Sequence, residues 1–357
     1  MALIWCEGFD DLVSGDIHTS GIAYEGRWDS FNSYGTGRWS IETGTRTGNG
    51  KELYCSSTPY AAQFIKDMSG QTTVIVGMAI KCETLLSDGG LVHFRDDNTG
   101  AQMVGFRVGG NGLVLADKDT SGWGNSHLCS STKTLPIGAW AYLEIKVFFD
   151  NTTGTIDFRI NGENAGSFTG LDTTAGVTTC GQVRFLMGDG TDQPAIYPAR
   201  IDDIYIADTT GSVNNDFLGP IEIVTIMPDG DGSTNAWTPS TGTVNADLVD
   251  EIPANGDTDY VSTATTTNQD LYTYANLDGN TNTVKAVQVS ARVRNEGAGS
   301  ETLKLLARSG TTTGASAAHG FDTTYLTVQD VFEVNPDTST AWTETTVNGA
   351  EFGIELA

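Results

Sequence analysis

Paired carboxylates are the first groups in this sequence that could do chemistry. A retaining glycosidase holds two carboxyl groups about 5–5.5 Å apart, and a strand can supply such a pair at alternate positions. Glu144 stands within a strand-like run, but the residues two positions away are Tyr142 and Lys146. Asp202 and Asp203 are adjacent, so a strand would direct their side chains to opposite faces. The sequence therefore offers no catalytic residue, and we predict that the chain is not an enzyme.

Histidines and nucleophiles give no stronger pattern. None of the four histidines has a Gly-x-Ser-x-Gly companion or a cysteine-protease signature near it: His18, His93, His127 and His319. An isolated histidine is more often a surface or packed residue than a catalytic base. The sequence therefore predicts no nucleophilic triad.

One segment has the oxygen-rich composition of a calcium loop. The run from Asp229 to Asn235 places carboxylate, hydroxyl and amide oxygens close together, which suits the ligands that calcium prefers. The bidentate Glu of an EF-hand is missing, because Ser240 stands where it would fall. We interpret the segment as an Asp/Gly turn that leads into Trp237, and we predict no metal and no cofactor.

Sugar binding requires aromatic faces flanked by hydrogen-bonding groups, and two loops have these ingredients. The first contributes Trp123, Asn125 and His127, and the second contributes Tyr34, Arg38 and Trp39. Aromatic residues that follow glycine-rich loops can also plug the ends of a β-sandwich, so both interpretations stay open. We take these six residues as candidate glycan contacts.

The elements that must position these side chains are strands. From Trp140 to Asn161, apolar residues occupy every second position on both sides of the polar turn 150–154. A period of two buries one face and leaves the other in water, and the turn reverses the chain. Short runs of the same kind recur between polar loops: 74–81, 103–108, 112–116, 182–187, 221–226, 270–275, 284–294, 302–308, 326–333 and 352–356. This pattern predicts an all-β fold of two antiparallel, jelly-roll-like β-sandwiches in tandem.

A change in composition divides the chain into two domains. All five cysteines precede residue 181, whereas Thr, Asn, Asp and Gly recur in the second half. We expect a first sandwich over residues 1–208, a polar linker over 209–220 and a second sandwich over 221–357. The cysteines are too widely spaced for a zinc ribbon, and we expect buried free thiols.

Charge and hydropathy exclude two kinds of partner. The 357 residues include 19 Lys and Arg against 45 Asp and Glu, which gives a formal net charge of −26. Such a surface repels nucleic acid phosphates, and no run reaches the roughly 20 apolar residues of a membrane span. The first residues lack the basic leader and apolar core of a secretion signal. We expect a protein that is made in a cytoplasm and leaves it, if at all, by a route other than secretion.

The first half of the chain resembles a concanavalin A-like jelly roll of the lectin or laminin G type. The residues that carry the resemblance are Glu7–Asp10, the hairpin Trp140–Gly162 and Arg200–Asp208. They cover roughly residues 1–208. The resemblance implies a fold in which the first and last strands lie close together.

The whole chain resembles virion structural proteins of tailed bacteriophages. In these proteins a lectin-like module is followed by Phe-Leu-Gly-Pro, here Phe217–Pro220, and by a second β domain. The matching segments of the second domain are Gly256–Val261, Asn335–Thr343 and Val347–Ile354. The resemblance implies synthesis in a bacterial host, assembly with other virion proteins and release by lysis. Display as a homo-oligomer, with a trimer as our expectation, is also implied, although no coiled-coil heptad is present to hold one.

Three functions follow from these observations. The first is a non-enzymatic virion structural protein displayed on the tail, baseplate, collar or capsid surface. The second is a receptor-binding adhesin whose lectin-like half binds a host-surface glycan. The third, which we place last, is an enzyme that degrades surface polysaccharide.

Overall fold

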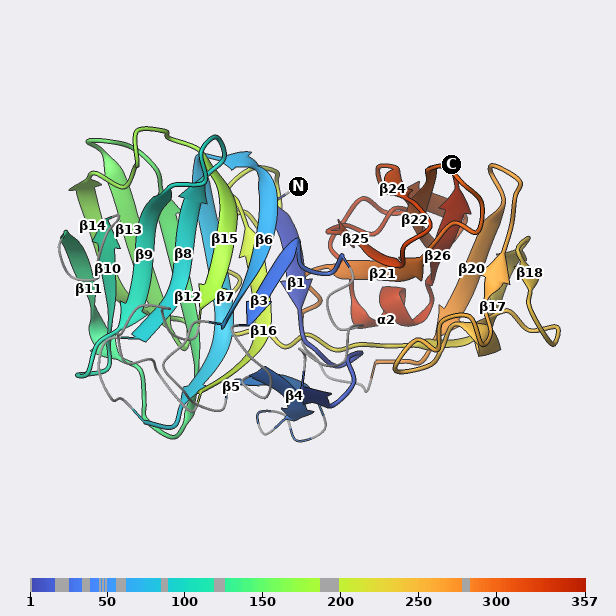
Figure 1. Cartoon of the computed structure of the whole chain (residues 1–357), viewed down its shortest axis with the longest axis horizontal. Coiled ribbons are helices and arrows are strands. Elements are labelled where there is room, and N and C mark those ends of the chain that lie inside the picture. The colour runs from blue at the N-terminus through green and yellow to red at the C-terminus, as the bar shows by residue number, and fades with distance from the viewer. Residues whose placement is uncertain are drawn as a thin grey trace.

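The computed structural model of this chain is built almost entirely from antiparallel strands, which confirms the predicted fold class. It describes residues 2–16, 26–33, 39–44, 46, 48, 50–55, 62–84, 89–118, 126–186, 199–277 and 283–357. Figure 1 shows two units, one formed by the strands of residues 3–207 and one by those of residues 228–356. Within the described residues, no helix is long and apolar enough to cross a membrane.

The first unit packs two sheets face to face. The nine-stranded sheet contains, in order, β14 (Glu163–Leu171), β13 (Gly154–Ile160), β12 (Trp140–Phe148), β7 (Thr73–Cys82), β16 (Ala199–Ala207), β5 (Lys51–Cys55), β4 (Trp39–Thr43) and β2 (Gly15–Asp16), with β1 (Leu3–Glu7) also paired to β16. The seven-stranded sheet contains β11 (His127–Thr134), β10 (Leu113–Lys118), β9 (Gln102–Val108), β8 (Gly89–Asp96), β15 (Cys180–Leu186), β6 (Ala62–Gln71) and β3 (Ser30–Ser33). The antiparallel pairing of β1 with β16 brings the first and last strands of the unit together.

The core lies between these two sheets. Phe94 and Phe106 of the seven-stranded sheet meet edge to face, with ring centroids 5.6 Å apart, and Phe106 meets Phe158 of the other sheet at 5.8 Å. Each of these rings is almost completely buried, which stabilises the fold by about 1.5–3 kcal/mol per side chain. The cysteines form no disulfide, and four of the five are buried as free thiols, as predicted.

The hairpin predicted at Trp140–Asn161 is present as β12 and β13, but its outward face is not in water as predicted. Glu144 is fully buried, and its carboxylate accepts hydrogen bonds from the Tyr205 hydroxyl at 2.6 Å and from Gly219 N at 2.9 Å. This burial raises the pKa of Glu144. The chain that follows β16 therefore covers the face that the alternation alone would leave exposed.

The prediction of a strand at 221–226 is wrong, because residues 208–227 form no helix or strand. Side chains of the first unit hold this backbone instead. Arg46 Nη2 donates to Ile221 O at 2.8 Å, and Ile223 N donates to Asp203 Oδ1 at 2.6 Å. The segment has its backbone groups bonded to side chains, so it does not need a neighbouring strand.

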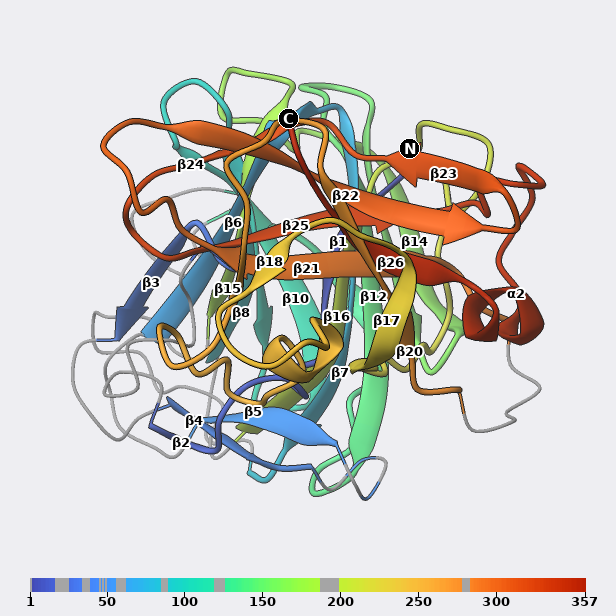
Figure 2. The ribbon, with the colours of Figure 1, turned by 90° about the vertical axis from the view of Figure 1, so that its right-hand side faces the viewer.

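The second unit packs a six-stranded sheet against a pair of strands. The sheet contains β17 (Pro228–Asn235), β20 (Gln269–Tyr274), β26 (Glu351–Leu356), β22 (Glu301–Ser309) and β23 (Thr312–Ala315), with β24 (His319–Phe321) also paired to β22. The pair is β21 (Val287–Val293) with β25 (Leu326–Phe332), and a smaller pair is β18 (Thr238–Pro239) with β19 (Val261–Ser262). Two short helices are η1 (Ala246–Leu248) and α2 (Glu344–Asn348). Figure 2 shows β21 and β25 running across the strands of the first unit.

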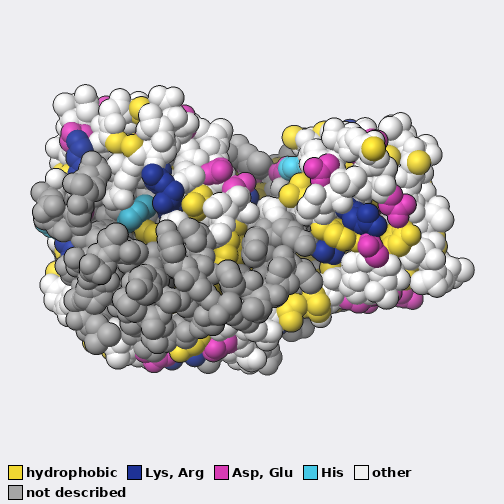
Figure 3. Space-filling view, in the orientation of Figure 1, with side chains coloured by type: hydrophobic (Ala, Val, Ile, Leu, Met, Phe, Trp, Pro, Cys, Tyr) yellow, Lys and Arg dark blue, Asp and Glu magenta, His cyan; other side chains and the backbone are white. Residues whose placement is uncertain are grey.

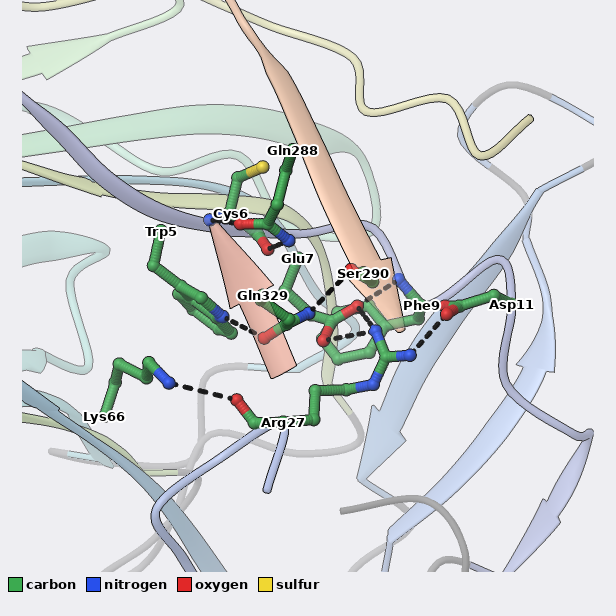
Figure 4. A network of polar contacts seen from close by, with 10 residues as sticks. All are labelled: Trp5, Cys6, Glu7, Phe9, Asp11, Arg27, Lys66, Gln288, Ser290 and Gln329. Atoms are coloured by element: carbon green, nitrogen blue, oxygen red, sulfur yellow. Dashed lines mark hydrogen bonds and ion pairs between the residues drawn. The ribbon is translucent and has the colours of Figure 1, made fainter. Parts of the chain in front are cut away.

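Strand β1 joins the two units, because one of its edges pairs with β16 and the other meets side chains of β21 and β25 (Figure 4). The side-chain amide of Gln288 makes the two hydrogen bonds to Cys6 that the backbone of a neighbouring strand would make. Its Oε1 accepts from Cys6 N at 3.0 Å, and its Nε2 donates to Cys6 O at 2.9 Å. Trp5 Nε1 donates to Gln329 Oε1 at 3.1 Å. An open strand edge invites pairing with another chain, and these amides close it.

The carboxylate of Glu333 holds the start of β1. It accepts hydrogen bonds from Ala2 N and Leu3 N, each at 2.9 Å, and Asn214 Nδ2 donates to it at 3.3 Å. Glu333 is 7% exposed, so these bonds are shielded from water. One side chain of the second unit thus satisfies two backbone donors of the first.

Replacing Glu333 should therefore weaken the junction of the two units. The Glu333→Gln variant keeps the size of the side chain but turns one acceptor into a donor that faces a backbone N–H. We expect a loss of about 1–3 kcal/mol in the free energy of unfolding, measured by urea denaturation. The exposed Glu301→Gln serves as the matched control and should change stability by less than about 0.5 kcal/mol. Equal stabilities of the two variants would contradict this role for Glu333.

A second prediction concerns Asp202 in β16. Burial, with the neighbouring Asp10 charge as a smaller cause, raises the pKa of Asp202 to about 8. A carboxyl whose folded pKa is raised contributes stability below its unfolded pKa, and that stability is lost as pH rises toward 8. Asp202→Asn should therefore be more stable than the wild type at pH 8, by at least about 1 kcal/mol. Thermal unfolding at pH 5 and pH 8 checks this: a gain that does not grow with pH would refute it.

Candidate functional site

The outer face of the seven-stranded sheet carries a concentration of polar side chains. In β8, Val92 and Phe94 are completely buried in the core, so His93 and Arg95 point to the other side of the sheet. The neighbouring strands alternate in the same way, with these outward residues: Gly105, Arg107, Leu115, Asp117, Gln182 and Arg184. Figure 3 shows Lys or Arg side chains and a His on the face that this sheet turns to the viewer.

Strand register places these side chains in rows across the sheet. Residues directly opposite each other in antiparallel strands face the same side, with Cβ atoms about 4.5–5.5 Å apart. The central row, from β6 to β11, is Ile65, Arg184, His93, Gly105, Asp117 and His127. The rows on either side contain Gln182, Arg95 and Gln102, and Arg107, Leu115 and Ser130. Six strands give the central row a length of about 24 Å.

The Asp117 carboxylate contacts two side chains of this surface, those of Arg107 and His127. Its Oδ2 lies 2.6 Å from Arg107 Nε, and its Oδ1 lies 3.2 Å from His127 Nδ1. Asp117 is 4% exposed and Arg107 is 6% exposed, whereas the His127 side chain is 45% exposed. The buried ion pair therefore fixes one end of an imidazole whose other end faces outward.

A β-bulge brings His127 and Ser130 to the same face. Ala116 stands opposite Cys129 and Asp117 stands opposite His127, so β11 has one extra residue, Leu128. Residues three apart on a regular strand point to opposite faces, and the bulge removes that opposition. As a result, His127 Nε2 lies 3.0 Å from Ser130 Oγ.

Two arginines at the other end of the site, Arg95 and Arg184, form no ion pair with any carboxylate that the structure describes. Arg184 Nε donates to Gln182 Oε1 and Arg184 Nη1 to Gln63 Oε1, both at 3.2 Å. Arg95 Nε is buried and meets no hydrogen-bond acceptor in the described part of the chain. Burial lowers the pKa of Arg95 below its usual value. Partial desolvation of the Arg95 cation is unfavourable in free energy, and an anion bound beside it would offset that penalty.

His93 stands between these arginines and Asp117. Burial, with the charge of Arg95 as the second cause, lowers the pKa of His93 to about 3. The imidazole is therefore neutral at physiological pH, with one donor and one acceptor nitrogen. Gly105 has no side chain and so leaves room for the His93 ring. A Cβ at position 105 would lie 3.1 Å from His93 Cδ2 and 2.6 Å from Gln102 Nε2.

The residues predicted to contact glycan have different outcomes. His127 belongs to the site just described. Trp123, Asn125, Tyr34 and Arg38 lie outside the described residues. The prediction for Trp39 is corrected: it is 1% exposed in β4 and packs against Phe31 and Phe64 with ring centroids 6.0 and 5.8 Å away. Its face is therefore inside the core and presents nothing to a sugar.

The run Asp229–Asn235 is neither a calcium loop nor a turn, but part of the irregular strand β17. Its carboxylates are engaged within the fold. Asp231 Oδ1 accepts from Ala246 N at 2.8 Å and its Oδ2 from Asn235 Nδ2 at 2.6 Å, while Asp229 Oδ1 accepts from Thr273 Oγ1 at 2.8 Å. Across the described residues, no three His, Cys, Asp or Glu side chains gather in a way that could hold a metal ion.

A cleft of about 740 Å³ lies between the two units. Trp28, Lys66, His319 and Tyr325 are among the residues that line it. Lys66 is already engaged, since its Nζ lies 3.3 Å from Asp29 Oδ2 and donates to Arg27 O at 3.3 Å. The sheet face, with its two cations free of carboxylate partners in the described part of the chain, is therefore the stronger candidate.

Sequence reasoning missed most of this site. Of its residues, the sequence analysis singles out only His127 as a candidate glycan contact; it treats His93 as an isolated histidine and does not single out Arg95, Arg107, Asp117 or Arg184. The available signal is alternation, because His93, Arg107 and Arg184 each sit between apolar residues of a strand. The sequence alone does not predict the pairing of β8 with β15 and of β10 with β11, which places the site residues side by side.

Comparison with known proteins shows the fold and no family. No family model matches this chain, and no curated protein matches it. The endo-β-1,4-glucuronan lyase of the fungus Trichoderma reesei is 14% identical, covers 55% of this chain and 94% of its own, and has a TM-score of 0.41. The alginate lyase of Aplysia kurodai is 12% identical over 57% and 98%, with a TM-score of 0.42. Domain 4 of an arabinanase from Geobacillus stearothermophilus, solved with arabinotriose, is 16% identical over 58% and 93%, with a TM-score of 0.37.

These comparisons correct one prediction from the sequence. We predicted that the chain is not an enzyme, yet two of the three similar structures are polysaccharide lyases. The absence of a sequence motif does not by itself exclude catalysis, because function resides in a site and not in a fold. All three similar structures are proteins of carbohydrate biochemistry, and none is a virion protein.

The buried ion pair makes a prediction about the stability of this site. Asp117→Asn removes the carboxylate that contacts Arg107 and leaves a cation in a poorly solvated position. We expect a loss of about 3 kcal/mol in the free energy of unfolding, because breaking a buried pair by removing one partner is costly. Asp157→Asn, at a half-buried position of β13, is the control and should cost less than about 1 kcal/mol. Urea denaturation of both variants measures the difference, and equal losses would refute the structural importance of Asp117.

Proposed function

We propose that this chain recognises an acidic polysaccharide on the outer face of the seven-stranded sheet. The observation that carries the proposal is the pair Arg95 and Arg184. Both guanidinium groups stand on one sheet face and form no ion pair with a carboxylate of the described residues, although the chain has a net charge of −26. In so acidic a protein, two arginines that the described residues leave without an ion pair favour an anionic ligand.

The chemistry of the face suits a sugar acid. A guanidinium binds a carboxylate or sulfate group through paired N–H donors. The amides of Gln63 and Gln182 can exchange hydrogen bonds with hydroxyl groups. The row of about 24 Å is an extended surface, which suits a polymer better than a small molecule. The β-sandwich fold shared with carbohydrate-related proteins is consistent with this ligand.

We further propose that this recognition takes place on a bacteriophage particle. The support is the resemblance of the whole chain to virion proteins, including Phe217–Pro220 at the end of the first unit. In that setting, the first unit binds polysaccharide on the host surface. The second unit contacts other virion proteins or further copies of the chain, as in a trimer.

A binding assay with the full chain tests the polysaccharide proposal. We expect binding to uronate-containing polysaccharides and little binding to neutral ones in biolayer interferometry. Arg184→Ala and Arg95→Ala should each weaken affinity about tenfold or more, since a hydrogen bond to a charged group contributes about 1.5–3 kcal/mol. Arg308→Ala, which removes an arginine from the second unit, is the matched control and should bind as the wild type does.

Two results would contradict the proposal. One is a preference for neutral polysaccharide over acidic polysaccharide. The other is wild-type affinity in both site variants while their thermal unfolding shows that they are folded. Measuring new reducing ends in the same samples distinguishes recognition from depolymerisation.

A further inference from the structure

The hydrogen bonds of Ser130, His127 and Asp117 have the order of a nucleophile, a base and an orienting carboxylate. Ser130 Oγ lies 3.0 Å from His127 Nε2, and His127 Nδ1 lies 3.2 Å from Asp117 Oδ1. These contacts involve the two different nitrogens of one ring, as a triad requires. A serine that merely shared a surface network could meet either nitrogen.

The fold holds this arrangement from both sides. Asp117 is buried, and its contact with Arg107 Nε at 2.6 Å fixes its position. It therefore favours the tautomer in which Nδ1 carries the proton, which leaves Nε2 free to accept the proton of Ser130. The bulge at Leu128 is what brings the hydroxyl to the ring. Bulges are often found beside active sites because they redirect a side chain.

The site is open where a substrate would have to enter. The His127 side chain is 45% exposed, and β11 is an edge strand of its sheet. Ser130 and Arg107 stand opposite the same residue, Leu115, from the two neighbouring strands.

We infer that Ser130 is an acyl-transfer nucleophile and that the first unit hydrolyses carboxylic esters. The natural substrate we assign is an O-acyl group on a sugar hydroxyl, because the row of polar side chains runs from the triad to Arg184. The identity of the substrate rests on the proposed function. The nucleophile does not, since it follows from the three side chains alone.

The reaction uses only the ester and water. Ser130 Oγ bonds to the acyl carbon as its proton passes to His127 Nε2, and the bond from that carbon to the sugar oxygen breaks. The proton then moves from Nε2 to the sugar oxygen, which leaves as a hydroxyl group. Water attacks the acyl-serine, gives a proton to Nε2 and releases the carboxylic acid, with Ser130 Oγ taking the proton back.

Active-site labelling of the native full chain tests the nucleophile directly. A fluorophosphonate should add one equivalent to the protein, and peptide mass mapping should place it on Ser130. Ser130→Ala should lose the label, and His127→Gln should lower the labelling rate about a hundredfold or more. Ser167→Ala is the matched control: Ser167 is an exposed serine that donates to the Asp157 carboxylate, and its loss should leave labelling unchanged.

The same variants give a turnover measurement. Hydrolysis of p-nitrophenyl acetate by the wild type should exceed that by Ser130→Ala, with Ser167→Ala equal to the wild type. No label on a native wild-type chain, or a label that persists in Ser130→Ala, would overturn the inference. Ser130→Cys guards against misfolding of the alanine variant, because its thiol should react with iodoacetamide faster than the native thiols; equal rates would also count against activation by His127. Neither probe contains a sugar, so these results are independent of polysaccharide binding.

Discussion

Burial of the inner face of the seven-stranded sheet is the constraint on which the rest of the site depends. Phe94, Phe106 and their neighbours can be removed from water only if every second residue of each strand points inward. The side chains of the residues between them must then point to the outer face of the sheet. Arg95, Arg107 and Arg184 are outside because the phenyl rings are inside. A slip of one residue in any of these strands would exchange the two sets and destroy both core and site.

The described contacts between the two units involve strand β1 rather than this face. The second unit meets the edge of β1 through the side chains of Gln288, Gln329 and Glu333. The segment that follows β16 covers the outer face of the other sheet, where Glu144 is buried. One outer face of the first sandwich is therefore used for architecture. The other outer face has two arginines, Arg95 and Arg184, that form no ion pair with a carboxylate in the described part of the chain.

The sequence predicted the strands well and the site poorly, for physical reasons. A period of two is local, so the hairpin of β12 and β13 can be identified from the residues between Trp140 and Asn161 alone. The site arises from pairing between strands far apart in sequence: His93 meets Arg184 across β8 and β15. Trp39 shows the same limit, because an aromatic residue after a glycine-rich loop can serve either core or surface, and only its contacts with Phe31 and Phe64 decide. The strand expected at 221–226 failed because side chains of Arg46 and Asp203 satisfy that backbone in place of a neighbouring strand.

The central claim is that the outer face of the seven-stranded sheet binds an acidic sugar chain. The most direct measurement is a crystal structure of the full chain with a uronate oligosaccharide. The account predicts density along the row from Arg184 to His127, with sugar carboxylates against the guanidinium groups of Arg184 and Arg95. An oligosaccharide bound only in the cleft between the two units, or on the second unit, would contradict it.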